Sequence, residues 1–98
     1  MGSREELVDF LDRHVFDPIL NASPNSYPER LRDDLQYVQD RTQSEKDRYH
    51  QYGSASEIVR MYKDDLKSDN AKPVNRKLHE LGLPRLVDVK EEFEKKAA

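Results

Sequence analysis

The stretch SASEIVRMYKDDLK, residues 54–67, decides the fold class of this chain. Its first serine is followed three residues later by Glu57, the signature of a capping box, in which the two side chains satisfy free backbone N–H groups at a helix start. Apolar residues then recur every three or four positions, as on one face of a helix; they are Ile58, Val59, Tyr62 and Leu66. The pattern predicts an amphipathic helix from about Ala55 to Lys67.

The same helix-start pattern occurs near the N-terminus, at Ser3–Glu6. A broad apolar stripe follows it and predicts a helix from about Arg4 to Phe16. Pro18 disfavours helical backbone at the residue before it, so we expect the helix to end or kink there. Ile19 and Leu20 are expected to continue as one short turn.

A third copy of the pattern, Ser26–Glu29, predicts a second helix that starts after Ser26 and runs to about Tyr52. Pro28 would lie in its first turn, where a proline is tolerated. Residues 39–57 contain no Leu, Ile, Val, Met or Phe. Such a segment buries little apolar surface, so we expect it to project from the core or to fray.

Two more helices are predicted downstream, over about Lys72 to Leu81, with Gly82 as the left-handed stop, and over about Pro84 to Lys96. No segment alternates apolar and polar residues over six positions, so no strand is expected. The sequence therefore predicts one all-α domain over residues 1–98. This domain is a small bundle of four to five helices with one long, polar-tipped helical hairpin.

Composition excludes several functional classes. The chain has 98 residues, of which 35% are hydrophobic and 38% charged, with three glycines, no cysteine and a net charge of −3. The lack of cysteine removes disulfides and thiol chemistry, and the scarcity of glycine removes phosphate-binding loops. No 18-residue apolar run is present, so no membrane association is expected, and the acidic start is wrong for a secretory signal. We expect a cytoplasmic protein.

The sequence contains no recognisable set of catalytic or metal-binding residues. Its adjacent carboxylate pairs, 33–34 and 64–65, diverge by about 100° on a helix and are typical of a solvated face. Asp47 and His50 form only half of a helical metal-binding motif. We therefore predict a non-catalytic protein without cofactor or metal.

The favoured function is protein–protein interaction, with a partner protein or with a second copy of the chain. Tyr and Arg carry much of the binding energy at protein interfaces. They are dense in the polar tip, where the candidate partner-binding residues are Arg48, Tyr49 and Tyr52. The alternative is that the two tyrosines pack within the chain against Ala55 or Tyr62, because amphipathic tyrosine serves either purpose.

Nucleic-acid binding by residues 72–85 is the alternative function. From residue 60 to residue 85 the chain carries seven Lys or Arg and four Asp or Glu, a local excess of positive charge on an acidic protein. Side chains suited to phosphates or base edges cluster there; they are Lys72, Asn75, Arg76, Lys77 and Arg85. The preceding helix and linker are longer than a helix-turn-helix uses, which makes this function less favoured.

Overall fold

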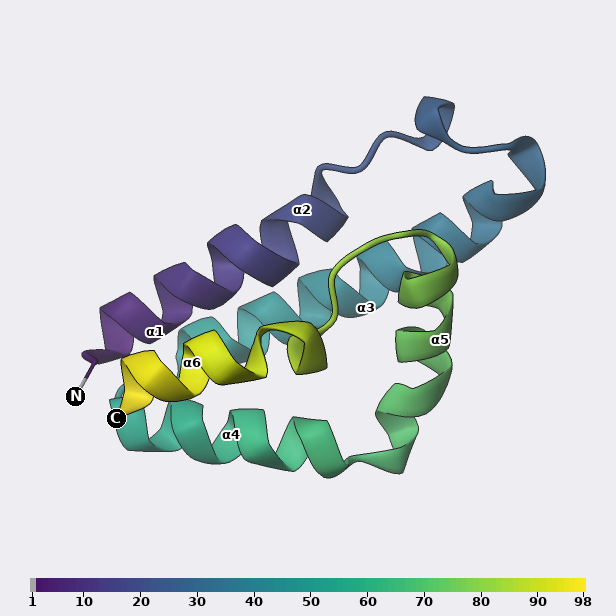
Figure 1. The fold of residues 1–98 in the computed structure, drawn as a ribbon. Coiled ribbons are helices and arrows are strands. Elements are labelled where there is room, and N and C mark those ends of the chain that lie inside the picture. Colours follow the sequence, from purple (N-terminus) through teal and green to yellow (C-terminus); the bar gives the residue numbers. More distant parts are fainter. Residues whose placement is uncertain (1) are drawn as a thin grey trace.

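The computed structural model describes residues 2–98 and is 82% helical, with five helices in a small bundle (Figure 1). No strand occurs within the described residues. The first helix and the long α3 (Arg32–Gln51) run beside each other, and α4 (Ala55–Lys67) and α6 (Lys90–Ala97) complete one end of the bundle. The two termini meet there, because the Gly2 N–H donates to the Lys96 carbonyl at 2.7 Å. The predicted all-α bundle is confirmed.

The first helix continues past its predicted end. α1 (Arg4–Leu11) passes through a π-helical segment, Asp12–Phe16, into α2 (Asp17–Leu20). The predicted helix end at Pro18 is wrong, because the helix continues past the proline through a wider π turn that lies directly before it. There, the Asp17 N–H donates to the Asp12 carbonyl, five residues back.

The second helix begins later than predicted, at Arg32, after a 3-10 turn over Glu29–Leu31. The predicted start at Ser26 is wrong because Tyr27, the residue before Pro28, is extended, with φ −122° and ψ 150°. The Tyr27 hydroxyl holds this conformation by donating to the Leu81 carbonyl at 2.7 Å.

Of the remaining helices, α4 and α5 follow the prediction closely, and the last one begins later than predicted. The Ser54 side chain caps α4 by accepting from the Glu57 N–H at 3.3 Å. α5 (Lys72–Glu80) ends before Gly82, whose φ of 70° is the left-handed conformation expected of a helix stop. α6 is preceded by a 3-10 turn, Leu86–Val89, in place of the predicted α-helical start.

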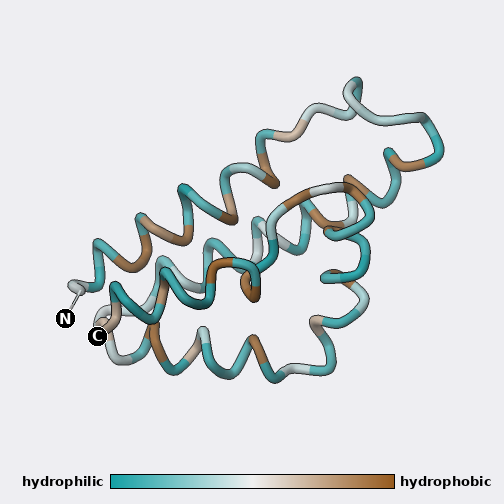
Figure 2. The backbone as a smooth tube through the Cα atoms, in the orientation of Figure 1, coloured by the Kyte–Doolittle hydropathy of each residue, from teal (hydrophilic) through white to brown (hydrophobic). Residues whose placement is uncertain are grey.

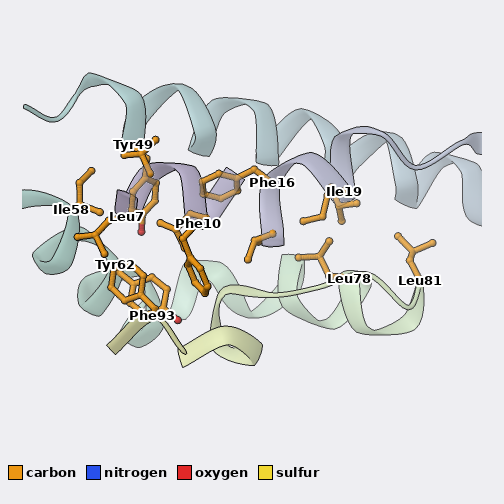
Figure 3. Close-up of a cluster of buried hydrophobic side chains, with 14 of the residues drawn as sticks. Leu7, Phe10, Phe16, Ile19, Tyr49, Ile58, Tyr62, Leu78, Leu81 and Phe93 are labelled. Carbon is orange, nitrogen blue, oxygen red and sulfur yellow. The ribbon is translucent and has the colours of Figure 1, made fainter. Parts of the chain in front are cut away.

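The core runs along the inner faces of the helices, and aromatic rings concentrate where α1, α4 and α6 meet (Figure 3). Tyr62 stacks on Phe93 with ring centroids 4.0 Å apart, and Phe16 lies 5.6 Å from Tyr49. The second half of α3 is hydrophilic along most of its length (Figure 2). It nevertheless packs into the bundle, so the prediction that it projects or frays is wrong.

Candidate binding groove

An inner hollow of about 400 Å³ lies between α3, α4, α5 and the turn at residues 86–89. Its floor comes from helices that are far apart in the sequence, and it is mostly aliphatic; it consists of Val15, Phe16, Ile19, Leu66, Val74, Leu78 and Leu86. The volume falls within the roughly 300–1,000 Å³ range of ligand pockets. The amphipathic faces of α4 and α5 therefore leave a space between them that no side chain of the bundle fills.

A second, outer hollow of about 640 Å³ runs between α4 and α6. It shares Leu66 and Val87 with the inner hollow, so the two adjoin along α4, and we call them together the α4 groove. Val87 is 46% exposed, the most exposed large apolar side chain among residues 2–98. Val87 extends the apolar surface of the two hollows to the outside of the bundle.

Three charged side chains, Glu45, Arg48 and Asp65, line one wall of the inner hollow, and the buried Tyr49 is hydrogen-bonded to Asp65. We call these four residues the Glu45 cluster. The Arg48 guanidinium donates to both Asp65 oxygens at 3.0 and 3.1 Å and to a Glu45 oxygen at 2.5 Å. The Tyr49 hydroxyl donates to Asp65 Oδ2 at 2.8 Å, one of the two oxygens that also accept from Arg48. Three of the four residues come from α3, spaced so that they share a helix face, and Asp65 reaches them from α4.

Burial and charge shift the protonation of this cluster. Desolvation, together with the neighbouring Asp65 carboxyl, raises the pKa of Glu45 to about 7, against the opposing pull of Arg48. Burial and the same carboxylates also raise the pKa of Tyr49, so its phenol stays a donor. Perturbed acids in a concave site are a physical sign of function. Glu45 changes its charge near neutral pH.

The predicted partner-binding residues do not form one exposed surface. Tyr49 is fully buried, so the expectation that it is held out for a partner is wrong. Arg48 lines the inner hollow. Tyr52 is half-buried beyond the end of α3, where its carbonyl accepts from Arg4 Nε at 2.6 Å. The intramolecular alternative is right that Tyr49 is buried, but the ring beside it is that of Phe16, not the predicted Ala55 or Tyr62.

The predicted nucleic-acid residues are dispersed, and three of them are paired with aspartates. Lys77 lies 2.7 Å from Asp34, Lys72 lies 3.0 Å from Asp69, and Arg85 lies 2.8 Å from Asp88. The other two residues lie in different surroundings: Asn75 lines the inner hollow, and Arg76 is exposed.

Sequence reasoning missed Glu45, Asp65 and Val87. Asp65 was assigned to a solvated face, because the sequence alone does not place it opposite Arg48. The available signal was the spacing of Glu45, Arg48 and Tyr49, which puts two charges and a phenol on one turn of a helix. A third partner from another helix has no such local signature.

No family model, curated protein or solved structure matches this chain. No helix among residues 2–98 is both long enough and apolar enough to cross a membrane. The α4 groove, with the Glu45 cluster on its wall, is thus the feature from which function is argued.

Proposed function

We propose that this protein is a small, non-catalytic protein–protein interaction module that holds a segment of a partner protein in the α4 groove. The observation that carries the proposal is the groove itself, two adjoining hollows with an aliphatic floor that meet at the exposed Val87. Grooves of this kind bind peptides or helices by taking in apolar anchor side chains.

The electrostatics of the wall support a binding role. A carboxyl whose pKa is raised to about 7 by burial costs folding free energy at neutral pH, because its ionised form is poorly solvated. Stability is commonly given up at functional sites and recovered when a partner binds. Glu45 fits that pattern.

The nucleic-acid alternative has less support, although it stays a prediction. Binding to phosphates needs cations that are free to displace counterions. Lys72, Lys77 and Arg85 are each in an ion pair with an aspartate of the same chain.

Site-specific photocrosslinking tests the proposed function. We would place a benzophenone amino acid at Val87 and, as a matched control, at Arg13, which is exposed on the first helix and lines neither hollow. The expected result is a discrete protein adduct, resistant to nuclease, from position 87 only. A Leu66→Lys change should remove that adduct while circular dichroism reports an intact fold.

Three outcomes would contradict the proposal. They are equal labelling at both positions, an adduct that Leu66→Lys leaves unchanged, and no adduct at all in the cells of origin. Sedimentation velocity distinguishes a second copy of this chain from a different protein, because a self-adduct requires a dimer in solution.

A further inference from the structure

The Glu45 cluster lacks one positive charge. Two carboxylates, Glu45 and Asp65, share Arg48, which is the one cation within ion-pair distance of either among residues 2–98. With both acids ionised the cluster carries a net charge of −1. The part of the lining formed by Glu45, Arg48 and Asp65 is therefore acidic when both carboxyls are ionised, and it adjoins apolar side chains.

Among residues 2–98, no other cation lies within ion-pair distance of Glu45 or Asp65. Arg41 also lines the hollow, but its guanidinium lies 5.3 Å from the Tyr37 ring centroid and donates to the Tyr37 hydroxyl at 3.2 Å. Lys46 is turned to the other side of α3, where it pairs with Asp17 at 2.7 Å. The residues that α5 and the first helix contribute to the hollow carry no charge.

We propose that the partner fills the inner hollow with a lysine or arginine side chain, whose aliphatic stem packs on the floor and whose cationic head pairs with Glu45 and Asp65. This inference rests on the proposed function and names the chemistry of the anchor. Lysine and arginine have the required form, since their stems bury on apolar surface while the charge reaches a polar partner.

Other anchors suit the hollow less well. A purely apolar side chain would remove water from the two carboxylates and give nothing in return, which costs free energy. An acidic side chain would be repelled by the same carboxylates. A cation both fills the volume and neutralises the cluster.

The anchor should bind more tightly as pH rises. Below pH 7 Glu45 takes up a proton and the cluster becomes neutral, whereas above pH 7 it is anionic and attracts the cation. Asp65, Arg48 and Tyr49 are the titratable groups in contact with this switch, with Arg41 at the rim. The ionised fraction of Glu45 rises about tenfold between pH 6 and pH 8, so affinity should rise by about the same factor.

Small probes of matched size test the chemistry. The side-chain methyl resonances of Leu66, Val74 and Val87 would be followed by NMR during titration with n-hexylammonium, n-hexanol and n-hexanoate. We expect hexylammonium to bind most tightly and hexanoate least, with the hexylammonium affinity rising about tenfold from pH 6 to pH 8.

Glu45→Gln is the decisive variant, because it keeps the shape and removes the charge. It should weaken hexylammonium binding at pH 8 by about fivefold or more, abolish the pH dependence and leave hexanol binding unchanged. Glu91→Gln, on the exposed outer side of α6, is the matched control and should behave as the unaltered protein. Equal binding of hexanol and hexylammonium, or a pH-independent affinity, would overturn the inference.

The two proposals fail separately. Crosslinking at Val87 without preference for the cationic probe would retain the interaction function and reject the cationic anchor. Preference for hexylammonium without any protein adduct would reject the partner protein and, with it, the anchor as stated, leaving a site for a free amine.

Discussion

The second half of α3 and the helix α5 are both rich in charged side chains, yet the bundle places them differently. Residues 39–51 of α3 contain no large aliphatic side chain, and Thr42 and Tyr49 from this segment are buried. α5 carries Val74 and Leu78 on one face, and only Leu78 of the two is buried. The count of aliphatic residues therefore does not decide which polar segment enters the core.

Hydrogen bonding explains the difference. Tyr49 brings a large apolar ring to the core and its hydroxyl donates to Asp65, so that burial leaves no unsatisfied group. By contrast, charged side chains of α5 form ion pairs near the surface, as Lys77 does with Asp34. A polar segment is buried where its polar atoms meet partners from another helix.

Among the changes that test why the α3 segment is buried, Tyr49→Ala should have the largest effect on stability. Loss of the ring should lower the free energy of unfolding by about 3–5 kcal/mol, as for other large core truncations. Tyr49→Phe, which removes only the hydrogen bond to the Asp65 carboxylate, should cost about 1.5–3 kcal/mol. Urea unfolding measures both, and the half-buried Tyr52→Ala is the control, expected to cost about 1 kcal/mol or less. A Tyr49→Ala protein as stable as the control would contradict the burial of this ring.

Much of the fold could be predicted from the sequence because local signals and tertiary contacts agree there. Ser54 caps α4 as its spacing predicts, and α4 has its predicted bounds. The same Ser-x-x-Glu pattern fails at Ser26, because Pro28 forces Tyr27 into extended backbone and tertiary contact holds it there. The pattern identifies a helix start only where the intervening residues accept helical backbone.

Less of the candidate groove could be predicted. Arg48 was identified from composition, but its role depends on Asp65, which lies 17 residues away in the sequence on another helix. The sequence leaves Tyr49 open between a partner surface and packing within the chain, because a count of apolar residues ignores what its hydroxyl can reach. Contacts between helices set these outcomes, and periodicity along one helix does not encode them.

A smaller effect on stability is expected from Glu45→Gln. This change removes the carboxylate that the second half of α3 contributes to the groove, and so tests what that charge costs the fold. The folded pKa of Glu45 is about 7 and its ordinary value is 4.5. The contribution of this group to stability is therefore fully present below pH 4.5 and is lost as pH rises through 7. Glutamine resembles the protonated acid, so the variant should be about 3 kcal/mol more stable than the unaltered protein at pH 8 and equal to it near pH 4. Thermal or urea unfolding across pH 4–8 checks this, and a constant difference at every pH would contradict it.

The smallest effect on stability is expected from a change on the exposed face of α5. Arg76 is exposed, so Arg76→Ala should change the free energy of unfolding by less than about 0.5 kcal/mol.

Asp34→Asn releases Lys77 from its ion pair and makes this face more basic. If residues 72–85 bind nucleic acid, Asp34→Asn should tighten and Arg76→Ala should weaken the binding of a random duplex, with a steep dependence on salt. Because the α4 groove is proposed as the binding site, we expect no mobility shift for either variant at about 50 mM salt, a condition that favours electrostatic binding. A shift that responds to the two variants in opposite directions would restore the nucleic-acid function, and it would make α5, rather than the α4 groove, the functional face of the bundle.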